Sequence, residues 1–206
     1  MEEIEASGRL KVGFPRLMGA NIIDDQIIAA CQGGDPEAFR LVYETYKDRV
    51  YSIALVFFDG NESSAKDITQ QVFLKLMTNI SKFESRSQFY TWLYRLVTNA
   101  CLDRKRALRR FLLFGSTEVE VRDKRRSVEE TYIQRELEAS VRTAISGLKP
   151  KLRIAILLKY FEDLSYDEIS AALGCSKGTV ASRLNRGHQI LARKLAHLRG
   201  AFAQGE

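Results

Sequence analysis

The sequence is poor in the residues that build metal sites and disulfide frameworks. It has three cysteines and two histidines in 206 residues, and none of their spacings matches a zinc site. An odd number of widely separated cysteines does not suggest a disulfide framework either, so we expect Cys31, Cys101 and Cys175 to be reduced, partly buried side chains. The sequence therefore predicts neither a metal ion nor a cofactor.

Long apolar runs are also absent. No run approaches the ~18 residues of a membrane-spanning helix, and the first residues lack the continuous hydrophobic segment of a signal peptide. We therefore expect a cytoplasmic protein without stable membrane insertion. The sequence also shows no nucleophile–base pair and no glycine-rich phosphate loop, which predicts a protein that is not an enzyme.

Helical periodicity is what the sequence has throughout. Apolar residues recur at helical spacing, no strand pattern or repeat appears, and a formal net charge of +6 favours a polyanionic partner. The pattern predicts an all-α protein of two small helical domains joined by a flexible linker. We place the boundaries at 1–22 for a flexible arm, 23–110 for the first domain, 111–126 for the linker, 127–199 for the second domain and 200–206 for a tail.

Capping residues mark the expected helix starts. Asp24 or Asp25 precedes a first short helix, and Asp35 followed by Pro36 predicts the start of a second. Further starts are predicted at Ser64 with Asp67, at Ser87, at the Ser127–Glu130 capping box and at Lys149–Pro150.

Residues 164–195 predict a helix-turn-helix. Ser165 and Glu168 form an S-x-x-E capping box, Gly174 can end the short helix that follows, and Ser176 can cap the next helix. The second helix has an apolar stripe that should pack on the first, and its opposite face is polar and basic. This arrangement is typical of a recognition helix that enters the DNA major groove, whereas the alternative is an αα-hairpin with a solvated face.

The recognition helix offers two kinds of DNA contact. Its first turn has free backbone N–H groups that suit phosphate, and Lys177 adds charge. Arg183 and Arg186 can reach base edges, and Arg186 lies closer to the centre of the outward face. The candidate DNA-binding residues of this helix are Ser176, Lys177, Thr179, Ser182, Arg183 and Arg186.

The helix expected at about 64–80 has an unusual polar face. Its apolar side is regular, but Leu74 falls on the other side and points outward. A single exposed leucine is ordinary. Surrounded by Asp67, Gln70 and Gln71, however, Leu74 predicts a surface that binds a partner protein.

A loop at 82–88, KFESRSQ, precedes a helix with a polar stripe of Gln88, Thr91, Arg95, Asn99 and Arg106. Trp92 falls on the apolar side of that helix and is expected in the core. Arginine and lysine neutralise phosphate while amides read unstacked bases, so the loop and stripe suit single-stranded DNA better than a merely solvated face. The candidate residues are Lys82, Phe83, Arg86, Ser87, Arg95, Asn99 and Arg106.

Four segments in order resemble an extracytoplasmic-function (ECF) sigma factor of the sigma-70 family, a class of bacterial RNA polymerase subunit. They read DPEAFRLVYETYKDRVYSIA, DITQQVFLKLM, KFESRSQFYTWLYRLVTNACLDRKRA and LKPKLRIAILLKYFEDLSYDEISAALGCSKGTVASRLNRGHQIL. The resemblance covers about 35–198. One departure is Ser170, where the family usually has alanine; the side chain stays small, so close helix packing should survive.

The resemblance implies the partners. A sigma factor binds the largest subunits of core RNA polymerase, directs it to promoter DNA and initiates transcription, and such proteins commonly have an anti-sigma factor. The resemblance assigns the Leu74 surface to core polymerase, the 82–88 loop and following helix to the −10 element, and the helix-turn-helix to the −35 element. The alternative is a helix-turn-helix regulator with a helical sensory domain, which would need a ligand pocket or a phosphoacceptor site.

Overall fold

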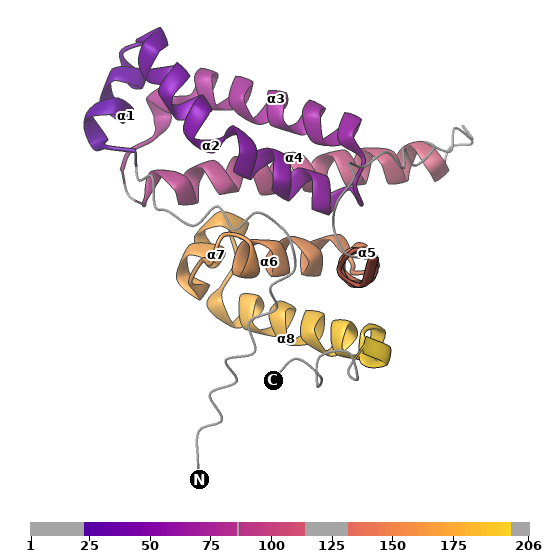
Figure 1. Cartoon of the computed structure of the whole chain (residues 1–206). Helices are drawn as coiled ribbons and strands as arrows, with labels where there is room; N and C mark the ends of the chain where they lie inside the picture. The colour runs from indigo at the N-terminus through magenta and orange to yellow at the C-terminus, as the bar shows by residue number, and fades with distance from the viewer. Residues whose placement is uncertain (1–22, 86, 114–131, 199–206) are drawn as a thin grey trace.

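The computed structural model describes residues 23–85, 87–113 and 132–198, and all regular structure in these ranges is helical (Figure 1). The all-α prediction is confirmed. No helix among these residues is long and apolar enough to cross a membrane. The elements are α1 Asp25–Gln32, α2 Pro36–Phe57, α3 Glu62–Asn79, η1 Ile80–Lys82, α4 Phe89–Leu113, α5 Tyr132–Ser146, α6 Pro150–Tyr160, α7 Tyr166–Leu173, α8 Lys177–Lys194 and η2 Ala196–Leu198. We call α1–α4 the N-domain and α5–α8 the C-domain.

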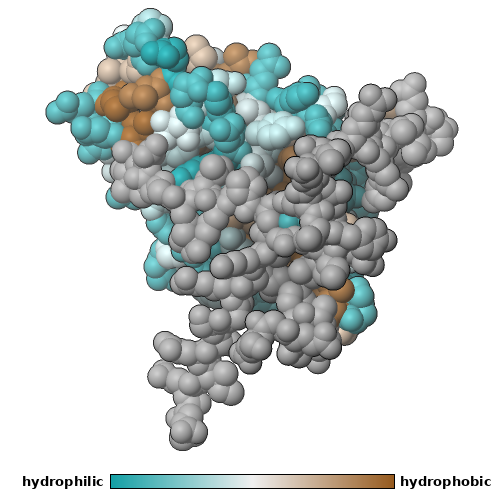
Figure 2. All heavy atoms as spheres, viewed as in Figure 1, coloured by the Kyte–Doolittle hydropathy of each residue, from teal (hydrophilic) through white to brown (hydrophobic). Residues whose placement is uncertain are grey.

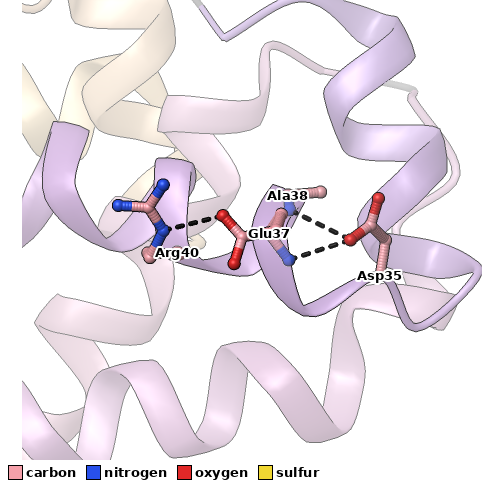
Figure 3. Close-up of polar contacts among 4 residues, drawn as sticks. All are labelled: Asp35, Glu37, Ala38 and Arg40. Carbon is pink, nitrogen blue, oxygen red and sulfur yellow. Dashed lines mark hydrogen bonds and ion pairs between the residues drawn. The ribbon is translucent and has the colours of Figure 1, made fainter.

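The first two helices begin where their capping residues predict. The Asp24 side chain accepts a hydrogen bond from the Gln26 amide and so caps α1. In α2, one carboxylate oxygen of Asp35 accepts from two amides of the first turn, while Pro36 occupies the first helical position (Figure 3). These bonds satisfy amides that have no partner inside the helix.

Two predicted starts were wrong. Helix α3 begins at Glu62 because Asn61, three residues before the expected cap Ser64, accepts from the Ser64 amide at 2.6 Å, and Ser64 itself is buried inside the helix. Helix α4 begins at Phe89, and the amides of Thr91 and Trp92 donate to the Gln88 carbonyl, so Ser87 lies before the start.

Helix α4 also continues through Leu113, three residues past the predicted domain end at Arg110. The predicted arm at 1–22, the linker from 114 onward, the capping box at Ser127–Glu130 and the tail at 200–206 lie outside the described residues. All three cysteines are free; Cys31 and Cys101 are buried and Cys175 is half-buried, as expected.

The predicted helix-turn-helix is present. Both halves of the Ser165–Glu168 capping box form at the start of α7, and Gly174 ends this helix in the left-handed conformation with φ of 58°. The hydroxyl of Ser170 donates to the Cys175 carbonyl at 2.5 Å, so it adds a bond across the turn. A Cβ on Gly187 of α8 would lie 3.0 Å from Ile156, which shows how closely α8 packs on α6.

Helix α6 has no solvated face along most of its length. Every residue from Leu152 to Leu158 is buried, including Arg153. An all-round apolar helix must be covered on several sides. Figure 1 shows the reason: α6 and α7 lie between α4 of the N-domain and α8, and α6 also contacts α2. The two domains therefore pack against each other and share one apolar core.

Candidate functional site

The outward face of α3 carries a shallow groove of about 420 Å³. All four residues predicted to bind a partner protein line it, together with two that the prediction did not include. Leu74 is 56% exposed. The lining residues are Asp67, Gln70, Gln71, Leu74, Lys75 and Thr78. In the space-filling view, apolar patches interrupt the polar surface over the N-domain (Figure 2).

Lys75 could not be singled out from the sequence because it looks like any solvated lysine. Asp67 also lines the groove, and its carboxylate is 3.7 Å from a guanidinium nitrogen of Arg104 in α4. Because both side chains are exposed, this ion pair is weak and can exchange for another partner.

The loop before α4 is only partly what the sequence suggested. Lys82 is exposed and donates to the Asn79 side chain at 3.3 Å, and Ser87 is exposed as well. Phe83, in contrast, is only 6% exposed, with its ring packed edge-on against Phe89. The structure therefore corrects its predicted role: the ring supports the loop from the core and has no free face for a DNA base. Arg86 lies outside the described residues.

The predicted polar stripe is exposed at four of its five positions, one of which, Gln88, lies just before α4. Arg95, Asn99 and Arg106 face solvent, and the Arg106 guanidinium pairs with Asp103 at 2.5 Å. Thr91 departs from the prediction because it is 2% exposed and so does not belong to the stripe. Trp92 packs against Phe83 and Phe89, as expected of a core residue.

The N-terminal turn of α8 is capped and already holds an ion pair. The Ser176 hydroxyl accepts from the Thr179 amide at 3.2 Å. The Lys177 ammonium lies 2.6 Å from the carboxylate of Asp167 in α7, although both side chains are about two-thirds exposed. Asp167 was not anticipated, since no local pattern shows that the first turn of α7 meets the first turn of α8.

The two candidate base readers of α8 differ in their surroundings. Arg183 is half-buried, and its guanidinium donates to the Cys175 sulfur at 3.4 Å. Arg186 is exposed and has no hydrogen-bond or ion-pair partner among the described residues. Ser182 is exposed beside them, with its hydroxyl donating to the Thr179 carbonyl.

Two family models of known proteins match the parts of the chain that contain these surfaces. The family model described as Sigma-70 region 2 matches residues 42–111, and that described as Sigma-70, region 4 matches residues 138–191. The α3 groove and the α4 stripe fall in the first range, and the turn and most of α8 fall in the second.

The similarity to known proteins extends over most of the chain. The ECF RNA polymerase sigma factor SigW of Bacillus subtilis is 32% identical over 174 residues, which are 80% of this chain and 92% of that protein. The ECF RNA polymerase sigma-E factor of Haemophilus influenzae is 30% identical over 190 residues, 88% of this chain and all of that protein. The sigma factor RpoE of Bartonella quintana, solved with the anti-sigma factor NepR, has a similar fold, with a TM-score of 0.64 at 22% identity over 78% of this chain and 98% of that one. The chain therefore belongs to the extracytoplasmic-function sigma factors of the sigma-70 family.

Proposed function

We propose that this sigma factor binds core RNA polymerase through the α3 groove, reads the −10 element with the loop at 82–88 and the α4 stripe, and reads the −35 element with α8. It is a specificity subunit that acts in the cytoplasm and has no catalytic residues of its own. The observation that carries the proposal is the groove, because an apolar side chain stands exposed at the centre of an otherwise polar lining.

Leu74 has the position expected of an interface centre. A partner that covers it removes apolar surface from water, while Gln70 and Gln71 on either side can exchange their water hydrogen bonds for bonds to the partner. Interface energy concentrates in a few central residues of this kind, and truncation of one typically costs ~2 kcal/mol or more.

The two DNA surfaces suit different forms of DNA. An α-helix fits the major groove of duplex DNA, and α8 presents Ser182 and Arg186 on its exposed face. The α4 stripe instead combines arginines with the Asn99 amide beside a polar loop, a surface that suits unpaired −10 bases and their phosphates.

An anti-sigma factor is a further proposed partner. The Bartonella quintana structure contains a sigma factor of similar fold together with one. The sensory-domain alternative has less support. Two hollows among the described residues, one on α3 and one beside α5 and α8, are open grooves, and neither is an enclosed ligand pocket.

The test is transcription by purified components. The chain added to core polymerase should start transcription from its promoter without another sigma factor. Leu74→Asp should lower the affinity for core polymerase at least tenfold, since a charge in a buried interface costs ~1.4 kcal/mol or more. Leu41→Asp is the matched control, because Leu41 is a leucine of similar exposure on α2, outside the groove.

Wild-type affinity of Leu74→Asp for core polymerase would remove the groove from the interface. An equal loss for Leu41→Asp would show that a new surface charge, and not the groove, causes the effect. Circular dichroism of both variants should match that of the wild type, because neither side chain is in the core.

A further inference from the structure

The last residue of α1 contacts the chain where the loop before α4 begins. The side-chain amide nitrogen of Gln32 donates to the Phe83 carbonyl at 2.8 Å and to the Ile80 carbonyl at 3.2 Å. Ile80 is the first residue of η1 and Phe83 follows its last residue, and α1 lies beside η1 at the end of α3 (Figure 1). We call residues 80–85 the loop entry. One side chain of α1 therefore binds the loop entry at two points.

Helix α1 holds Gln32 in a fixed position. Ile28 and Cys31 are buried and attach the helix to the core of the N-domain. Directly after Gln32, the Gly33 amide donates to the Ala29 carbonyl at 3.0 Å, and Gly34 turns the chain toward α2 with φ of 86°. Because the backbone on both sides of Gln32 is fixed, its amide can hold the loop entry in place.

The loop entry contains a residue that needs support from its surroundings. Ser85 has φ of 52°, in the left-handed region that residues other than glycine seldom adopt. Such a conformation persists only where neighbouring contacts enforce it. The ring of Phe83, two residues earlier, packs against Phe89 and Trp92, and the Phe83 carbonyl accepts from Gln32. Two separate contacts thus fix the backbone just before Ser85.

The position of the loop entry matters for the reading of bases. Polar groups select a base only when they are held within about 0.5 Å of the productive geometry. Lys82, a candidate −10 residue, is exposed and lies between the two carbonyls that Gln32 binds. Both N–H groups of the Gln32 amide are engaged with these carbonyls, which suits Gln32 for positioning and not for a DNA contact of its own.

We propose that Gln32 is a positioning residue for −10 recognition, which sets the geometry of the loop entry and thereby the base preference without touching DNA. The inference rests on the proposed −10 function of the loop. No local pattern in the sequence indicates this role, because the two carbonyls belong to residues 48 and 51 positions away.

Trp92 reports the state of the loop entry. It is the only tryptophan of the chain, it is half-buried, and its ring centroid lies 5.5 Å from that of Phe83. Gln32→Leu removes both donors and should raise the quenching of Trp92 fluorescence by acrylamide about twofold, because Phe83 loses one of its two contacts. Gln32→Lys supplies new N–H donors and should be quenched like the wild type. Gln26→Leu is the matched control, since Gln26 is an exposed glutamine in the first turn of the same helix.

Base selection tests the functional half. Each protein, combined with core polymerase, selects from single-stranded DNA with a randomised stretch. Gln32→Leu should lower the enrichment of the preferred bases about threefold. The salt slope of its affinity should stay unchanged, because no phosphate contact is removed. Gln32→Lys should recover the wild-type order of bases, and Gln26→Leu should keep it. Because lysine adds a charge, Gln32→Lys is compared by base order and quenching only.

Wild-type enrichment by Gln32→Leu would overturn the proposal. A smaller salt slope for this variant would also overturn it, because Gln32 would then contact the DNA backbone itself. An equal loss for Gln26→Leu, or no recovery for Gln32→Lys, would contradict the role of the two hydrogen bonds. If the wild type itself enriches no base, the proposed −10 function fails, whereas the quenching still shows whether Gln32 holds the loop entry. Circular dichroism should be unchanged because Gln32 is exposed. If Gln32→Leu nevertheless unfolds, Gln32→Glu, which has the same shape but no N–H donor, provides the same two measurements.

Discussion

The basic side chains of the two proposed DNA-binding helices, α4 and α8, have different kinds of partners. In the C-domain the partners lie within the helix-turn-helix. Asp167 forms an ion pair with Lys177, and the Cys175 sulfur accepts a hydrogen bond from Arg183. In the N-domain, Arg106 pairs within α4, but Arg104 reaches Asp67 in the α3 groove. An ion pair thus connects the −10 helix to the proposed polymerase surface, and the C-domain has no equivalent among its described residues.

Among the predicted DNA-binding residues, each helix has one arginine without a partner among the described residues, Arg95 in α4 and Arg186 in α8. A paired cation must give up its partner before it meets DNA, whereas an unpaired arginine loses only water and rotamer freedom. The comparison therefore singles out Arg95 and Arg186 as the side chains most ready to bind DNA.

The largest effect is expected at Arg186. Arg186→Ala should relax the preference for one base of the −35 element, because a bidentate contact to guanine provides ~1–3 kcal/mol of discrimination. Arg183→Ala should change base preference less, since Arg183 is held beside Cys175. Binding is measured on single-base −35 substitutions at fixed salt. An unchanged order of preference in both variants would mean that α8 reads DNA shape and backbone.

The next effect concerns Arg95. Arg95→Ala should weaken binding to single-stranded −10 DNA of every sequence and reduce the salt slope of the affinity by ~0.7, the value for one phosphate contact on a single strand. Arg106→Ala is the matched comparison and should change the slope less, because Asp103 already neutralises Arg106. Equal slopes for the two variants would show that the ion pair does not matter for binding.

The smallest effect is expected at the Asp167–Lys177 pair. An exposed pair contributes only ~0–1 kcal/mol, so Asp167→Asn should free Lys177 and tighten binding to all duplexes alike by less than about fivefold. Lys177→Ala should weaken binding without a change in base preference. Salt titrations with both variants check this, and a change in the order of −35 bases would contradict a purely electrostatic role.

Local chemistry explains what the sequence predicted well. The caps at Asp35 and Ser176 and the capping box at Ser165–Glu168 act over two or three residues, so a short stretch of sequence contains all the information. Helical spacing likewise predicted that Leu74 points outward, and its side chain is exposed in the structure. The Ser64 prediction failed because Asn61 offers an equally good cap slightly earlier.

Contacts between distant segments explain what the sequence did not predict. The burial of Phe83 depends on rings in α4, and the hydrogen bonds between the two domains join residues that are 68 to 96 positions apart. One signal was present, however. From Leu152 to Leu158, helix α6 is apolar on every side except for Arg153, which indicates a helix covered by more than the helix-turn-helix. A charged residue within such a helix requires polar partners, and one of them, the Phe57 carbonyl, belongs to the other domain.

The separation of Arg153 from Phe57 also has a consequence during synthesis of the protein. These residues are 96 positions apart, so at ~5–20 residues per second the ribosome adds Arg153 about 5 to 20 seconds after Phe57. In the later part of that interval α4 has been synthesised, while the face of α4 that Tyr94 occupies has no complete C-domain to cover it. A nascent chain therefore passes through a period in which its newly made half is open to capture by a partner before it can close on itself.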